Sequence, residues 1–171
     1  AQRIHQLLRE GKIQQAQESL QEGFRQFPES TDLRQERLHL NLLAGQPELA
    51  AAEARQILQA KPSAQPYRLP LSDSSPAIRS LALRAFALDP PEHPSPLGIL
   101  RNALKDTDPT VRREAAEASR ILSTPEALPL LREASKDSDW LTRSISARLL
   151  GSRNDPSAIP DLFKMLGDRD S

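Results

Sequence analysis

The chain repeats itself with two different periods, and this constrains its fold more than any single residue does. The first block, up to residue 62, repeats every 34 positions, and the rest repeats every 31 to 33 positions. Periods of this length are typical of solenoids, in which each unit buries its apolar face only against its neighbours. Such a fold has a long exposed surface in place of an enclosed pocket, which favours binding over catalysis.

In the first block, the recurring positions are apolar side chains, one glycine and one proline. Ile4, Leu8, Gly11, Ala16, Leu20, Phe24 and Pro28 recur as Leu38, Leu42, Gly45, Ala50, Ala54, Leu58 and Pro62. Glycine is favoured just after a helix, and proline cannot continue one. The pattern therefore predicts helices over 1–10, 13–27, 31–44 and 47–61, with small residues at Ala16 and Ala50 that let paired helices approach closely.

In the second block, the recurring positions combine Asp, Pro and Arg with apolar residues. Asp73, Pro76, Ile78 and Arg79 recur as Asp106, Pro109, Val111 and Arg112. Asp106, Asp108, Arg112 and Ala116 recur as Asp137, Asp139, Arg143 and Ala147, and the cycle restarts at Ile159 and stops at Asp168 and Asp170. A Ser, Thr or Asp before a proline is a strong start signal for a helix. This pair occurs at Ser75, Ser95, Asp108, Thr124 and Asp155.

These signals predict helices over 76–88, 96–105, 109–122, 125–136, 140–151 and 156–167. Residues 63–72 form a junction with at most one irregular turn, and 89–94 form a stiff loop that contains His93. The chain starts without a methionine and ends within a repeat. We therefore expect a processed or excised form of a protein with further repeats.

The first block, 1–62, resembles the tetratricopeptide repeat. The resemblance rests on the glycine between the helices, the small residue five positions after it and the proline seventeen after it, as in Gly45, Ala50 and Pro62. Apart from Phe24, the large aromatic residues of that family are missing. By this resemblance, the first helix of each pair lines an inner groove.

The second block, 73–171, resembles HEAT repeats, particularly the short bacterial kind also found in phycobilisome-lyase-like proteins. The segments 104–116 and 135–147 carry the resemblance. The last repeat is incomplete, and the repeat at 73–88 lacks a first helix, so we expect the junction or the last tetratricopeptide-like helix to replace it. In HEAT families, the repeated Arg pairs with a loop Asp of its own or an adjacent repeat. This resemblance implies internal ties between Asp106 and Arg112 and between Asp137 and Arg143.

Composition supports an all-α fold, since valine is scarce and aromatic residues make up only 4% of the chain. The net charge is zero overall and in each block, which argues against a nucleic-acid partner because such proteins usually carry a basic stripe. The chain contains no cysteine, and no run reaches about 18 apolar residues. We predict a soluble α-solenoid, a superhelix of antiparallel hairpins, from the bacterial periplasm or cytoplasm.

Three patterns resemble functional sites. Asp-x-Asp at 106/108, 137/139 and 168/170 has the oxygen ligands of a cation site, but we interpret it as helix capping that recurs with the fold. Arg79, Arg112 and Arg143 suit phosphate, but the HEAT resemblance makes them structural. His5 and His39 lie one period apart, and a metal, a partner contact or an incidental surface position are all open for them.

We predict no catalytic residue, no metal site and no cofactor, since no phosphate-binding glycine loop, zinc motif or nucleophile elbow is present. The leading function is a non-enzymatic scaffold that binds a protein or peptide along the concave solenoid surface. The alternatives are a HEAT-type nucleic-acid module and a chaperone-like lyase subunit. The apolar segment 159–166 also predicts self-association. The candidate contact residues are His5, Arg34, Arg37, His39, Asn41, Arg113, Glu117, Arg120, Ser144 and Arg148.

Overall fold

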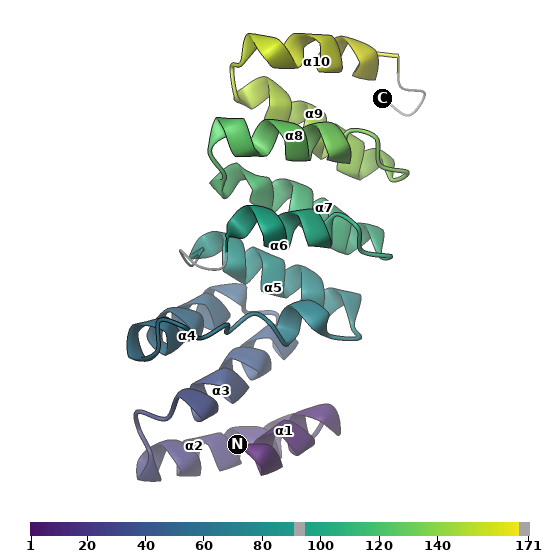
Figure 1. The fold of residues 1–171 in the computed structure, drawn as a ribbon. Helices are drawn as coiled ribbons and strands as arrows, with labels where there is room; N and C mark the ends of the chain where they lie inside the picture. Colours follow the sequence, from purple (N-terminus) through teal and green to yellow (C-terminus); the bar gives the residue numbers. More distant parts are fainter. Residues whose placement is uncertain (91–94, 168–171) are drawn as a thin grey trace. The chain divides into compact units, whose positions relative to one another are not determined.

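A computed structural model of the chain describes residues 1–90 and 95–167, and these residues form helices and short 3₁₀ turns without a strand (Figure 1). The first helices are α1 (Gln2–Arg9), α2 (Ile13–Gln26), α3 (Thr31–Leu43), α4 (Pro47–Ala60) and α5 (Pro76–Leu88). They are followed by α6 (Pro96–Ala103), α7 (Pro109–Ala118), α8 (Thr124–Ala134), α9 (Trp140–Ser152) and α10 (Ile159–Met165). The predicted all-α solenoid is confirmed.

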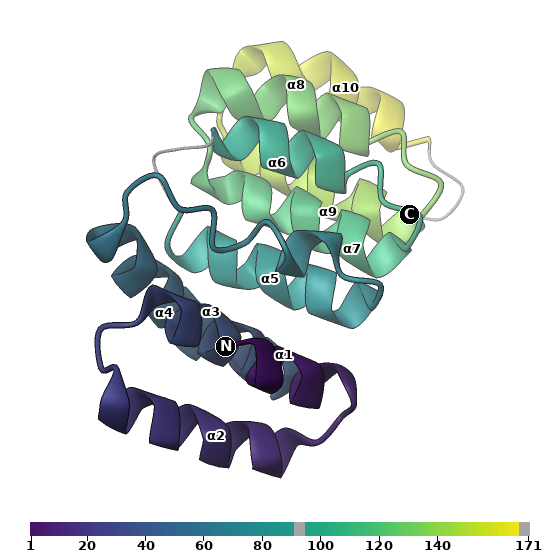
Figure 2. The same cartoon turned by 60° about the horizontal axis from the view of Figure 1, so that its bottom comes forward.

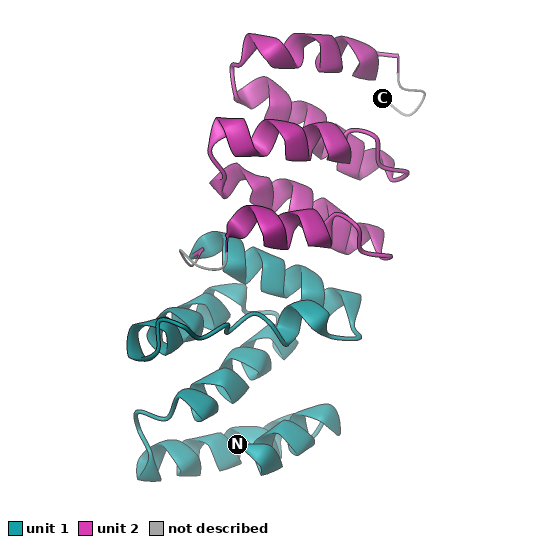
Figure 3. Cartoon of the chain, viewed as in Figure 1, with its two compact units in different colours: residues 1–89 teal, residues 90–171 magenta. Residues whose placement is uncertain are grey.

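The helices divide into two compact units, residues 1–89 and residues 90–171 (Figure 3). Unit 1 holds α1 to α5, and unit 2 holds α6 to α10. This division follows packing, so α5 belongs to unit 1 although its sequence repeats in the second block. The division by repeat type, 1–62 and 73–171 around a junction at 63–72, stays a prediction.

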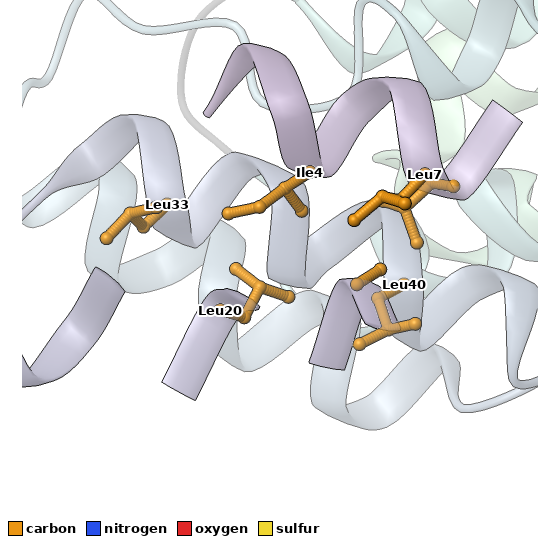
Figure 4. Close-up of a cluster of buried hydrophobic side chains, with 7 residues drawn as sticks. Ile4, Leu7, Leu20, Leu33 and Leu40 are labelled. Atoms are coloured by element: carbon orange, nitrogen blue, oxygen red, sulfur yellow. The ribbon is translucent and has the colours of Figure 1, made fainter. Parts of the chain in front are cut away.

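In unit 1, the apolar faces of α1, α2 and α3 meet in one core (Figure 4). Ile4 and Leu7 of α1 pack with Leu20 of α2 and with Leu33 and Leu40 of α3. Three short amphipathic helices thus share one core that none of them could bury alone.

Two glycines in unit 1 mark the hairpin turns. Gly11 follows α1 with φ 71°, and Gly45 follows α3 with φ 70°, a backbone conformation that favours glycine. They lie 34 residues apart, as the repeat predicts.

The junction 63–72 is an ordered part of unit 1. It contains one 3₁₀ turn, Pro70–Ser72, and packs with α4 against α5. Tyr67 is buried there, with its ring edge-on to Phe86 of α5 at 5.6 Å between centroids. We expected either α4 or the junction to replace the missing first helix of the repeat at 73–88. In the structure, both pack against α5 in its place.

Unit 2 consists of two layers (Figure 2). Helices α6, α8 and α10 form one layer, and α7 and α9 form the other, with contacts both along and between the layers. Leu100, Leu131, Ala115 and Leu150 fill the space between them without exposure to solvent. The buried apolar side chains of unit 2 are mostly leucine and alanine.

Two predicted helices are wrong at one end. The segment 109–122 is α-helical only to Ala118 and continues as a 3₁₀ turn, Ser119–Ile121. The segment 156–167 begins with a 3₁₀ turn, Pro156–Ala158, before α10. In both places the hydrogen bonds tighten from the α to the 3₁₀ pattern at a helix end, which the apolar spacing does not reveal.

The predicted caps are only partly correct. Asp108 and Asp155 accept a hydrogen bond from the backbone two residues on, but Ser75 and Ser95 accept none with their side chains. The proline after each serine already removes an amide that would need a partner. Thr124 is the first residue of α8 and not its cap, because the helix begins after Ser123, whose hydroxyl and amide both contact Glu126.

Three residues that the sequence singled out, His93, Asp168 and Asp170, lie outside the described residues. Within the described ranges, no helix is both long enough and apolar enough to cross a bilayer.

The close packing of α3 and α4 leads to a stability prediction. Ala50 of α4 is fully buried, whereas Ala52 on the same helix is exposed. Ala50→Leu should lower the free energy of unfolding by about 1–3 kcal/mol, because the added carbons have no space. Ala52→Leu adds the same atoms at the surface and serves as the control. Equal urea unfolding midpoints for the two variants would contradict the close packing.

Candidate functional site

The Asp-x-Asp motifs of unit 2 shape the loops before α7 and α9. Asp106 Oδ1 accepts a hydrogen bond from the Asp108 amide at 2.9 Å, and Asp137 Oδ1 accepts one from the Asp139 amide at 2.8 Å. Asp108 and Asp139 then cap α7 and α9. Among the described residues, no three His, Cys, Asp or Glu side chains lie together as a metal site would require. Capping accounts for both described motifs.

Arg112 ties one repeat to the next. Its guanidinium binds both carboxylate oxygens of Asp137, with Nε 2.8 Å from Oδ2 and Nη2 3.0 Å from Oδ1. Within its own repeat, it donates to the carbonyl oxygen of Asp106 at 3.0 Å, and Arg143 likewise donates to the carbonyl of Asp137. Within a repeat, the expected tie is thus made to the backbone carbonyl of the Asp and not to its carboxylate. The carboxylate that binds Arg112 belongs to the Asp of the adjacent repeat.

Arg113 makes a second tie that the sequence analysis placed on the partner-binding surface. It binds Asp139 through two hydrogen bonds, at 2.7 and 2.5 Å. Asp139 also accepts hydrogen bonds from the amide and the hydroxyl of Thr142, both at 2.9 Å. The Arg113 guanidinium, together with these donors, holds the pKa of Asp139 well below its ordinary value.

The remaining candidates in unit 2 form a ridge along α7 and α9. Glu117 of α7 pairs with Arg120 at 3.3 Å and also with Arg148 of α9. Ser144 lies exposed on α9. The ridge therefore carries mixed, mutually paired charge, and its role as a contact surface stays a prediction.

Two further ties were missed by the sequence analysis. Arg132 of α8 binds Asp161 of α10 at 2.7 Å, and Arg153 donates to the carbonyl oxygen of Leu122 at 2.9 Å. One signal was present, because Arg132 follows Arg101 by one 31-residue period. No charge pattern in the sequence points to the carbonyl that Arg153 contacts.

In unit 1, Arg34 and Arg37 of α3 share one carboxylate. Glu53 of α4 is buried, with Oε1 2.7 Å from Arg37 Nη2 and Oε2 3.8 Å from Arg34 Nη1. Arg37 also lies over the ring of Phe24, 4.3 Å from its centroid, and Arg34 lies 6.0 Å from it. The structure thus brings together two predicted residues with Phe24 and Glu53. Glu53 has no charged counterpart one period earlier, so the repeat gave no signal for it.

Two open grooves adjoin α2. The groove between α2 and α3, here called the α2–α3 groove, is lined by Gln17, Leu20, Gln21, Phe24, Arg25, Arg37 and Leu40. The other groove runs between α1, α2 and the start of α3, and its lining includes Arg3, three acidic residues (Glu18, Glu22 and Asp32) and the exposed ring of Phe27. The charged side chains of the α2–α3 groove are thus cationic, whereas those of the second groove are mostly acidic.

His5 and His39 lie together, with ring centroids 6.4 Å apart, as their equivalent repeat positions suggest. His5 Nδ1 lies 3.3 Å from Glu36 Oε2. Burial lowers the pKa of His39, although the charge of Asp73 acts in the opposite direction. Asn41, further along α3, accepts the Gln46 amide through its backbone carbonyl at 2.8 Å. These residues lie on α1 and α3, the first helices of their hairpins.

Comparison with known families places HEAT repeats in the middle of the chain. Residues 68–147 match the family model of HEAT repeats, a range that starts in the junction and ends in α9. No curated protein and no solved structure matches the chain. HEAT-like repeats are thus supported by both the match and the fold, whereas the tetratricopeptide-like character of 1–62 and the bacterial origin stay predictions.

The Arg113–Asp139 pair leads to a prediction on pH. Because folding lowers the pKa of Asp139, the unfolded chain takes up this proton first as the pH falls. The pair's stabilisation is complete above about pH 4, the ordinary Asp pKa, and is lost as the pH falls below it toward the folded-state pKa. Asp139→Asn should lower stability at neutral pH by about 1–3 kcal/mol and flatten the acid dependence.

Asp108→Asn is the control, because Asp108 also caps the start of a helix, α7, although through the amide two residues on, Thr110, and not three residues on as for Asp139. Urea unfolding between about pH 2 and pH 7 measures both variants. A pH profile of Asp139→Asn identical to that of the parent would show that the pair contributes nothing.

Proposed function

We propose that the chain is a non-enzymatic scaffold that binds a protein or peptide partner along the surface of its stacked hairpins, with the concave surface expected to carry the contact. The observation that supports this most is the pair of open grooves beside α2, which combine apolar side chains with charged ones that are cationic in one groove and mostly acidic in the other. The HEAT-like repeats support it further, because helical repeats of this kind commonly serve as interaction surfaces.

A nucleic-acid partner is less well supported. Arg112, Arg113 and Arg132 each bind an Asp of the following repeat, so their charge is already neutralised within the fold. A protein that follows a phosphate backbone needs cations that are free to release its counterions. The lyase alternative has no observation in its favour.

Photo-crosslinking tests the proposed function. Benzoylphenylalanine is placed at Asn41 or Ser144, both predicted contacts, and at the exposed Gln59 of α4 as the control, in a lysate of the source organism. We expect a discrete protein adduct from the contact positions that is absent from Gln59. Adducts that contain nucleic acid, or identical adduct patterns from all three positions, would contradict the proposal.

Self-association through α10 is a separate proposal, with a second copy of the chain as the partner. Ile159, Phe163 and Leu166 are 49%, 69% and 77% exposed. At the corresponding position of α8, Arg132, 31 residues before Phe163, contacts Asp161 of the next helix in the same layer, α10. The α10 of a second copy of the chain would present the same apolar side chains to this exposed face.

Sedimentation velocity tests this association. The parent should show a concentration-dependent dimer, and Phe163→Ser should shift it to monomer, because exposed apolar area drives such contacts. Lys164→Ser, which changes an exposed neighbour on α10, should leave the dimer intact. A parent that stays monomeric at every concentration would rule the association out.

A further inference from the structure

The α2–α3 groove has a defined polarity. The helices that form it are joined by the short loop 27–30 and run back along each other. Gln17 and Gln21 lie one turn apart on α2, and Arg25 follows one turn later. Arg37 lies over Phe24, which is next to Arg25 in the chain. Leu20 and Leu40 form the apolar part of the groove, on the side of Gln17 (Leu20 and Leu40 are labelled in Figure 4). The groove thus has a cationic end and an apolar end with amides beside it.

The charged side chains that line this groove are both cationic. Arg25 is 76% exposed and reaches only Glu22 on its own helix, at 3.2 Å, in the weak geometry of a surface pair. Arg37 receives one oxygen of Glu53 from the α4 side at 2.7 Å, whereas Arg34 lies 3.5 Å from Glu29 and 3.8 Å from the other oxygen of Glu53. Glu22 and Glu53 do not line the groove, so the charged side chains that face a ligand there are the two guanidinium groups.

The guanidinium of Arg37 is oriented in advance for an anionic ligand. Its stacking on Phe24 fixes the plane of the guanidinium. The side chain as a whole is still 37% exposed at the groove. A guanidinium fixed in advance loses less entropy when it binds a carboxylate.

We propose that the α2–α3 groove binds an acidic peptide segment of a protein partner. A carboxylate of the peptide lies at Arg37 and Arg25, and a neighbouring apolar side chain packs over Leu20 and Leu40. The glutamine amides contact the peptide backbone. This inference rests on the proposed scaffold function and names the chemistry of one partner.

A peptide fits this groove better than a nucleic acid. Nucleic-acid grooves present several cations and aromatic faces on which bases stack. Here the ring of Phe24 is already covered by Arg37, and the floor is aliphatic. Aliphatic side chains beside a few polar groups are typical of peptide grooves.

Fluorescence anisotropy with two labelled ten-residue peptides tests the inference. Both contain the same leucines and serines, and four positions are glutamate in one and lysine in the other. The glutamate peptide should bind the full chain at least about tenfold more tightly, and more weakly as salt rises, because the attraction is electrostatic. Arg37→Gln should reduce this affinity about tenfold or more, and Arg25→Gln by about two- to fivefold.

Two further variants keep the test decisive if Arg37→Gln fails to fold. Gln21→Glu places a negative charge in the groove at an exposed position and should weaken binding of the glutamate peptide, so that the difference in affinity between the two peptides becomes smaller. Gln59→Glu adds the same charge at an exposed position of α4, outside the groove, and should leave peptide binding unchanged. Arg101→Gln removes an exposed arginine from α6 and should also leave peptide binding unchanged. Equal binding of the two peptides, no binding of either, or parent-like binding by Gln21→Glu would overturn the inference. Tighter binding of a single-stranded oligonucleotide would overturn it in favour of nucleic acid.

The outcomes separate this inference from the proposed function. If the glutamate peptide does not bind but Asn41 or Ser144 still crosslinks to a protein, the scaffold function stands and the groove assignment fails. If no position yields a protein adduct, the scaffold function itself fails, whatever the peptides do.

Discussion

The buried apolar side chains of the described residues lie between helices that are close together in the chain. Over residues 1–90 and 95–167, the substantial contacts join elements that lie no more than two helices apart. The shared core of α1, α2 and α3 and the two layers of unit 2 are both local arrangements. Leucine and alanine suffice for such cores, because each has to fill only the narrow space between neighbouring helices. The surfaces that remain open to a partner are the outer faces and grooves of these hairpins.

Polar side chains fix the register of this stack. In unit 2, one Asp shapes each loop and a second caps the following helix, while Arg112, Arg113 and Arg132 reach to the next repeat. Bidentate pairs of this kind demand a defined geometry, so they specify how one repeat sits on the next more than they add stability. Unit 1 uses its arginines differently, because Arg34 and Arg37 converge on Glu53 and Phe24 beside an open groove. The side chains available to a partner are accordingly clearest in unit 1.

The sequence predicted the helices well, because period, proline and glycine act locally. Gly11 and Gly45 occupy their left-handed positions, and each predicted helix is present with small changes at its ends. The sequence predicted side-chain partners less well. Asp106 and Arg112 are six residues apart in one repeat, yet the carboxylate that binds Arg112 belongs to Asp137, 25 residues later. The repeat pattern did not predict the role of Glu53, because its partners lie on another helix and this charge does not recur one period away. Partner choice depends on the angle between helices, which a periodic pattern does not encode.

Hydrogen exchange measured by mass spectrometry on a single core variant tests the local packing most directly. Leu131 lies fully buried in α8, and Leu131→Ala should cost about 2–5 kcal/mol of local stability. We predict faster exchange in α7, α8 and α9 and unchanged exchange in α1, α2 and α3, since these helices share no core with α8. Equal acceleration throughout the chain would mean that one cooperative interior unites all the helices, and it would contradict the solenoid on which the functional proposals depend.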